Sequence, residues 1–196
     1  MAPDERRQAI IAATLPLLLE QGPELSTREI AQAAGVAEGT IFRAFETKQD
    51  LIHATIHAAL QPSAALDALA DLPDGQSLTE RVSAIFDVLR GEIRRTRSLF
   101  LHLSQSSGRP FPPHPPNPGK PFPQGRPNES RDRLVQAVTV ALAAYTGELA
   151  VPVDFAAQVL TVLAFATSFS LTEDNPLAQS HQLALVVLHG IAKGDS

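Results

Sequence analysis

The side chains best suited to recognition chemistry lie between Leu25 and Lys48, where polar and apolar residues alternate closely. Arg43 carries a guanidinium that can bond a guanine edge or a phosphate, and the Glu38 carboxylate can accept from a cytosine amine. Gly39 has no side chain and would let the backbone approach a ligand closely. These residue types at this spacing favour contact with nucleic acid.

Two short helices joined by a glycine turn would hold these side chains. Ser26 and Glu29 are spaced as a capping box, which predicts a helix from Thr27 to about Ala34. Gly35 supplies the turn. A second helix is expected from about Ala37 to Phe45, so the segment reads as a helix-turn-helix, whose second helix enters the major groove of DNA.

The second helix has an inward and an outward face. Ile41 and Phe45 are four residues apart and are the predicted anchors in the core. Thr47 with Asp50 repeats the capping box and opens a third helix, which is expected to end near Leu60. The residues left toward solvent or DNA are Glu38, Gly39, Thr40, Phe42, Arg43 and Ala44.

The pattern L-S-T-R-E-I-A-x-x-A-G-V-x-x-G-T-I-F-x-x-F-x-x-K-x-x-L resembles the DNA-binding domain of the TetR-type transcriptional repressors, over roughly Glu5 to Ile56. The resemblance implies an all-α fold. A three-helix helix-turn-helix DNA-binding domain is expected over residues 1–47, followed by a helical effector-binding and dimerisation domain over residues 48–196. With the contacts that the family implies, the expected DNA-binding set is Thr27, Arg28, Ala37, Glu38, Gly39, Thr40, Phe42, Arg43, Ala44 and Lys48.

Two positions depart from the family pattern. Phe42 stands where the family usually carries a tyrosine, so the phenolic donor to a phosphate is missing. Ala37 stands where a capping hydroxyl is common, and its loss costs about 1 kcal/mol of helix stability. The alternative interpretation of the motif is a three-helix unit that serves protein contacts without binding DNA.

Charge gives no support for DNA binding. Residues 1–60 contain five basic and eight acidic side chains, so their formal balance is 5 − 8 = −3. A DNA-binding domain is usually basic. The balance therefore predicts a modest affinity with a shallow salt dependence.

Composition excludes several kinds of chemistry. The chain of 196 residues has no cysteine, which excludes disulfides, thiolate metal sites and a cysteine nucleophile. It contains no G-x-S-x-G, H-E-x-x-H or glycine-rich phosphate loop, so we expect neither an enzyme nor a cofactor. His53 and His57 share a helix face with Asp50 and could hold a divalent metal, but no further ligand is evident and no metal is predicted. Residues 1–20 lack the pattern of a signal peptide, so a cytoplasmic location is expected.

The second half is expected to be a helical bundle. A short acidic linker is predicted over Asp67–Gln76, and the Ser77–Glu80 capping box opens a long amphipathic helix. Nine of the nineteen residues in 109–127 are proline, which predicts an extended loop. That loop is either a recognition segment for a partner or a surface insertion. Helices are expected over 129–147, 153–171 and 176–192.

The last two helices carry apolar residues on more than one face. A membrane span would need about 20 predominantly apolar residues, and polar residues interrupt the 155–171 stretch. Burial against a second copy is the favoured interpretation, and the resemblance implies a four-helix dimer interface. The candidate interface residues are Phe155, Val159, Val162, Phe165, Phe169, Leu183, Val187 and Ile191.

Polar groups within the apolar helices are candidates for a ligand cavity, although each could equally be satisfied within its helix. The candidate pocket residues are Phe86, Leu89, Phe100, His102, Tyr145 and Thr167. Taken together, the expected function is that of a homodimeric transcriptional repressor, bound to a palindromic double-stranded DNA operator and released by a small-molecule effector. The alternative is a helical interaction protein that does not bind DNA.

Overall fold

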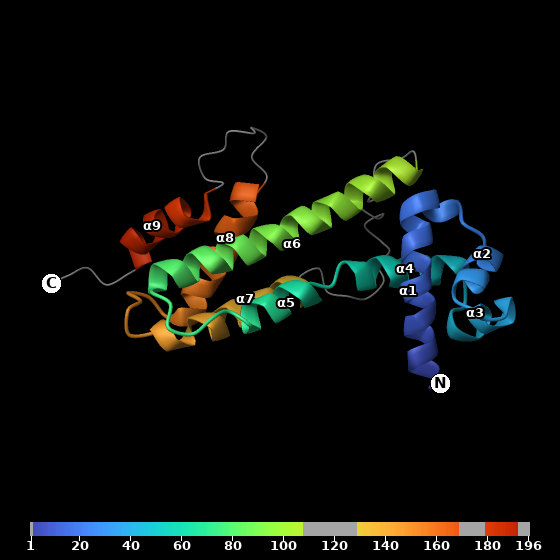
Figure 1. Cartoon of the computed structure of the whole chain (residues 1–196), viewed down its shortest axis with the longest axis horizontal. Helices are drawn as coiled ribbons and strands as arrows, with labels where there is room; N and C mark the ends of the chain where they lie inside the picture. Colours follow the sequence, from blue (N-terminus) through green and yellow to red (C-terminus); the bar gives the residue numbers. More distant parts are fainter. Residues whose placement is uncertain (1, 108–128, 169–178, 192–196) are drawn as a thin grey trace, which may run out of the picture. The chain divides into compact units, whose positions relative to one another are not determined.

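The computed structural model describes residues 2–107, 129–168 and 179–191, and it confirms the predicted all-α class with an N-terminal helix-turn-helix (Figure 1). The chain divides into two compact units. The first unit comprises residues 1–61 with 96–125, and the second comprises residues 62–95 with 126–196. The predicted domain boundary between residues 47 and 48 stays a prediction, and α4 (Lys48–Ala59), which follows it, packs within the first unit.

The first unit is built around one long helix and three shorter ones. Its elements are α1 (Pro3–Gln21), the 3₁₀ turn η1 (Gly22–Glu24), α2 (Thr27–Ala33), α3 (Glu38–Ala44), α4 (Lys48–Ala59) and the last part of α6. Helix α1 packs against α2, α3 and α4. The buried apolar core includes Ile10, Leu18, Leu25, Ile30, Ile41, Phe45, Leu51, Ile52 and Leu103.

Local capping starts the helices where the sequence predicts. The Ser26 N–H donates to the Glu29 carboxylate at 2.8 Å, and the Glu29 N–H donates back to the Ser26 hydroxyl at 3.2 Å. Thr47 and Asp50 exchange the same two bonds at 3.0 and 3.1 Å. Gly35 has a φ of +64°, which is the left-handed conformation that the turn between α2 and α3 requires.

The second unit is a helical bundle with its own core. Its elements are α5 (Ser63–Ala70), the first part of α6 (Leu78–Ser107), α7 (Glu129–Leu142), η2 (Ala143–Tyr145), α8 (Val153–Ser168) and α9 (Ser180–Ile191). The Ser77–Glu80 capping box at the start of α6 is confirmed. Helix α7 packs against both α5 and α8. Core residues include Val82, Ile85, Phe86, Leu89, Val138, Leu142, Leu160 and Leu188.

Four sequence expectations differ from the structure or lie outside its described residues. The predicted linker Asp67–Gln76 is wrong at its start, because α5 continues to Ala70 with Leu69 buried in the core. Helix α7 ends at Leu142, earlier than the predicted residue 147. The proline-rich segment 109–127 and the predicted end of the 153–171 helix lie outside the described residues. Among the helices that are described, none is long and apolar enough to cross a membrane.

Candidate nucleic-acid interface

Helix α3 has the two faces that its sequence predicts. Ile41 is fully buried and Phe45 is 4% exposed, so both are anchored in the core of the first unit. The Phe42 side chain is 52% exposed, and Arg43 is exposed beside it. A Cβ added at Gly39 would meet no atom within 4 Å. The outward face is therefore accessible, and packing does not explain why position 39 is a glycine.

The start of α3 is tied to the start of α2 by two residues from the expected DNA-binding set. The Thr27 hydroxyl donates to the Glu38 carboxylate at 2.5 Å. A hydroxyl has one proton to donate, so Thr27 cannot bond a phosphate as a donor while this bond is present. Ala37 caps α3 without a side-chain hydrogen bond, in agreement with its departure from the family pattern.

The basic side chains of the first unit differ in whether they are exposed or donate to main-chain carbonyls. Arg28 on α2 and Arg43 on α3 are exposed. The half-buried Lys48 donates from Nζ to the Leu25 carbonyl at 3.2 Å, just before the cap of α2. Arg7 on α1 donates from Nη1 to the Ala44 carbonyl at 2.7 Å. Sequence reasoning missed the Lys48 and Arg7 contacts, which join residues 23 and 37 positions apart and leave no periodic signal.

The candidate pocket residues are not gathered in one cavity of the bundle. Phe86 and Leu89 are packed in the core of the second unit. Phe100 and His102 belong to the first unit instead, and His102 is exposed, with Nδ1 2.8 Å from the Ser98 carbonyl oxygen. The prediction placed both residues in the C-terminal bundle, whereas the contacts place them in the first unit, and His102 faces solvent.

The two other polar candidates are satisfied within the second unit. The Tyr145 hydroxyl donates to the Gln76 carbonyl at 2.7 Å. The Thr167 hydroxyl donates to the Leu163 carbonyl at 2.7 Å and accepts from Arg90 Nη2 at 3.1 Å. These bonds fit the alternative in which such groups stabilise the fold, and a ligand role for them stays a prediction.

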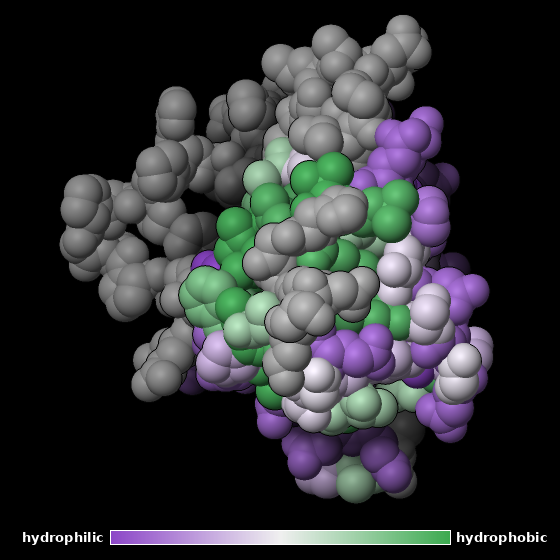
Figure 2. All heavy atoms as spheres, turned by 90° about the vertical axis from the view of Figure 1, so that its left-hand side faces the viewer, coloured by the Kyte–Doolittle hydropathy of each residue, from purple (hydrophilic) through white to green (hydrophobic). Residues whose placement is uncertain are grey.

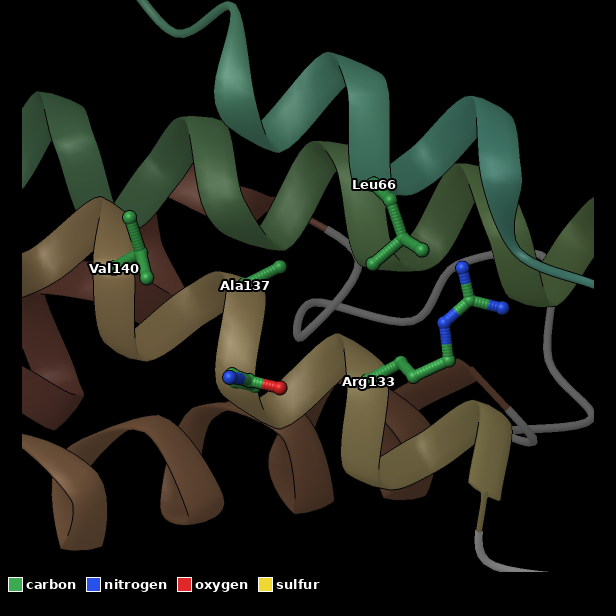
Figure 3. Close-up of a pocket in the computed structure, with 5 residues that line it drawn as sticks. Leu66, Arg133, Ala137 and Val140 are labelled. Carbon is green, nitrogen blue, oxygen red and sulfur yellow. The ribbon is translucent and has the colours of Figure 1, made fainter.

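A shallow open depression does exist between α5 and α7, with a volume of about 250 Å³. It is lined by Leu66, Arg133, Gln136, Ala137 and Val140. Figure 3 shows Leu66 reaching from α5 toward Ala137 on α7. The lining residues are not among those predicted: Leu66 lies on α5, which the sequence analysis did not predict, and the other four lie on the predicted helix α7.

Five large apolar side chains are exposed on α8 and α9, and we call them together the α8/α9 face: Phe155, Val162, Phe165, Leu185 and Val186. Figure 2 shows apolar side chains gathered on the end of the second unit that lies at the left of Figure 1. Three of the predicted interface residues, Phe155, Val162 and Phe165, belong to this face. The half-buried Val159 lies one turn after Phe155 on α8.

Two predicted interface residues need correction. Leu183 and Val187 are 4% and 8% exposed, because the inward stripe of α9 packs them into the core of their own protomer. Phe169 lies outside the described residues, and the structure describes only the backbone of Ile191. The outward stripe of α9 is formed by Leu185 and Val186 instead.

Within the described part of the chain, no three His, Cys, Asp or Glu side chains gather as a metal site. What the first unit does define, by α2, the Gly35 turn and α3, is a helix-turn-helix domain. Residues 10–55 match the model of the bacterial regulatory proteins of the tetR family. The match covers the helix-turn-helix of the first unit, so this part of the chain is similar to the DNA-binding domain of the tetR-family regulators.

Relatives agree with this assignment. The HTH-type transcriptional repressor KstR of Rhodococcus jostii is 32% identical over 95 residues, which are 48% of this chain and 43% of that protein, so the match spans less than half of the relative. Three solved structures share the fold. A TetR transcription regulator from Haloarcula marismortui has a TM-score of 0.61 at 17% identity, and the match covers 97% of this chain and 100% of that chain. A tetR-family transcriptional regulator from Streptomyces coelicolor has a TM-score of 0.54 at 21% identity, over 94% of this chain and 79% of that chain. A Saccharomonospora viridis protein in complex with choline has a TM-score of 0.55 at 18% identity, over 97% of this chain and 100% of that chain.

Proposed function

We propose that this protein is a homodimeric transcriptional repressor that inserts α3 into the major groove of a palindromic operator. The observation that carries the proposal is the accessible face of α3, with Arg43 and Phe42 exposed and Ile41 and Phe45 anchored. In a helix-turn-helix, a helix of this kind reads base edges. A DNA-binding role also requires a cytoplasmic location, with access to the chromosome.

Each outward residue has a role that follows from its chemistry. Arg43 bonds the O6 and N7 atoms of a guanine, and Glu38 accepts from a cytosine amine. Arg28 neutralises a phosphate. Gly39 keeps the helix backbone close to the DNA, since no side chain intervenes.

Two copies are needed to read a palindrome. Five large apolar residues on the α8/α9 face are each 41% or more exposed in the single chain. Contiguous exposed apolar surface of this kind is uncommon on soluble monomers. Packing two such faces about a two-fold axis would bury them in an isologous interface, and the same axis would separate the two α3 helices by about one helical turn of DNA, roughly 34 Å, or by a multiple of it.

Release from DNA would follow from binding of a small-molecule effector to the helical part of the chain. Regulators of this family bind small molecules as well as DNA. An effector shifts the equilibrium only if it binds one conformer better than the other. Helix α4 is followed by α5 across the boundary at Gln61 and Pro62, so a displacement in the second unit would reach α4 through the chain itself.

The experiment is genome-wide capture of DNA fragments by the purified protein, followed by gel shifts with Arg43→Ala and Gly39→Ala. Arg43→Ala should relax base preference and cost about 1–3 kcal/mol of operator binding. Gly39→Ala should stabilise α3 by up to about 1 kcal/mol and yet weaken DNA binding, because the added methyl faces the DNA. If the wild type enriches no sequence, the protein is the helical interaction protein of the alternative interpretation.

A further inference from the structure

We infer that Arg7 is a positioning residue for helix α3, holding the end of the helix that we propose reads DNA. Arg7 Nη1 donates to the Ala44 carbonyl at 2.7 Å. The Arg7 guanidinium carbon also lies 4.1 Å from the centre of the Phe45 ring. Ala44 is the last residue of α3 and Phe45 is its C-cap, so one side chain of α1 holds the end of α3 by two contacts, which we call the Arg7 clamp.

A helix of seven residues depends on such contacts. Helices this short are unstable in isolation, because few backbone bonds offset the cost of nucleation. The last carbonyls of a helix have no donor within it. The Phe45 N–H satisfies the Ile41 carbonyl at 2.9 Å, and Arg7 satisfies the Ala44 carbonyl. A cation at this end also interacts favourably with the helix dipole.

The geometry calls for arginine rather than for a positive charge alone. Phe45 is 4% exposed, and the guanidinium covers its ring while donating to the neighbouring carbonyl. A planar guanidinium can stack on a ring through its face and donate within its plane at the same time, whereas a lysine ammonium cannot reproduce both contacts. The substitution Arg7→Lys would therefore keep the charge and lose the Arg7 clamp.

The exposed residues of α3 depend on the Arg7 clamp for their direction. Phe42 and Arg43 lie within the last turn, directly before Ala44. Movement of that end would displace the Arg43 side chain from a base edge, where bidentate bonding demands accurate placement. Arg7 therefore contributes to base reading without touching DNA.

The test compares wild type, Arg7→Gln and Arg7→Lys, with Arg28→Gln as the matched variant in which an exposed arginine is removed. The first readout is hydrogen exchange at the Phe45 amide, which needs no DNA. The second is binding, over a range of salt concentrations, to a mixed-sequence duplex and to a duplex captured from genomic DNA by the wild type. This second readout rests on the proposed function.

Both Arg7 variants should speed exchange at the Phe45 amide about tenfold, because the charge-assisted bond and the ring contact are lost together. They should lose about tenfold in preference for the captured duplex and keep the wild-type salt slope. Arg28→Gln removes one phosphate contact from each protomer of the dimer, so it should weaken binding to both duplexes alike and reduce the salt slope by about two, without changing exchange.

Unchanged exchange at Phe45 would overturn the inference, as would rescue by Arg7→Lys. A salt slope reduced by about two in the Arg7→Gln dimer would identify Arg7 as a phosphate contact instead. If neither Arg7 variant folds, Arg7 holds the whole unit rather than α3, and the assignment is wrong. If the wild type shows no preference between the duplexes, the proposed function fails, while the exchange comparison still decides the role of Arg7.

Discussion

Val186 on α9 and Val140 on α7 provide a matched test of the proposed dimer. Both are valines of the second unit, and they are 66% and 69% exposed in the single chain. Val186 belongs to the α8/α9 face and Val140 does not. Changing each to glutamate therefore makes the same chemical change at two equally exposed sites, of which one is proposed to be buried between protomers.

We expect Val186→Glu to lower the free energy of dimer dissociation strongly, because the two-fold axis places the substitution in the interface twice. Burying a whole valine side chain is worth about 1.5 kcal/mol, so the exposed two-thirds of Val186 gives about 1 kcal/mol per copy and about 2 kcal/mol per dimer. Val186→Glu also buries two unpaired carboxylates, at several kcal/mol each. A loss of even about 4 kcal/mol raises the dimer Kd roughly a thousandfold.

Light scattering over a range of protein concentrations measures the effect, and circular dichroism checks that each variant keeps its helices. Wild type and Val140→Glu should be dimers, whereas Val186→Glu should be a folded monomer with weakened operator binding. A wild type that is monomeric at micromolar concentration would refute the reasoning. A Val186→Glu dimer of wild-type affinity, or equal dissociation of both variants, would place the interface elsewhere.

Three further changes probe the fold itself. Val187→Glu places a carboxylate in the core of the second unit, since Val187 is 8% exposed, and it should lower the melting temperature even in a monomeric background. Pro16→Ala restores a backbone donor inside α1 and should raise the free energy of unfolding in urea by up to about 3 kcal/mol; an unchanged midpoint would contradict this. Hydrogen bonds from Ser26 lower the pKa of Glu29 below its ordinary 4.5, so the stabilisation is complete above pH 4.5 and is lost as the pH falls through the lowered pKa. Acid titrations of unfolding should show this loss in the wild type and not in Glu29→Gln.

The features that were predicted correctly depend on residues close together in sequence. The capping boxes at Ser26 and Thr47 join residues three apart, and the anchors Ile41 and Phe45 are one helical turn apart. Such pairs are fixed by helix geometry alone. The Gly35 turn is also predictable from local sequence, because its left-handed φ is a conformation that glycine adopts readily.

Helix α9 illustrates what sequence could not decide. Its apolar residues occupy two stripes, one with Leu183 and Val187 and one with Leu185 and Val186. Periodicity shows that an apolar stripe exists, but it cannot choose between two neighbouring stripes of similar character. The rotation of α9 against its own bundle makes that choice, and it turns Val186 outward. That a pair of apolar helices offers a surface to a second copy stays a prediction, now with different residues on α9.

The positions of the charges reconcile an acidic domain with a DNA-binding role. Of the five basic side chains in residues 1–60, Arg7 and Lys48 donate to main-chain carbonyls at the end of α3 and before α2. Their charges therefore stabilise the helix-turn-helix, whereas Arg28 and Arg43 are exposed on its two helices. Phosphate neutralisation contributes a slope of about −0.9 per contact in the dependence of log K on log salt concentration, so a dimer with the one phosphate contact of Arg28 in each protomer would show a slope of only about −1.8. With so little non-specific attraction, the proposed discrimination between DNA sequences would depend on the placement of α3, whose two ends are held by Thr27 and Arg7.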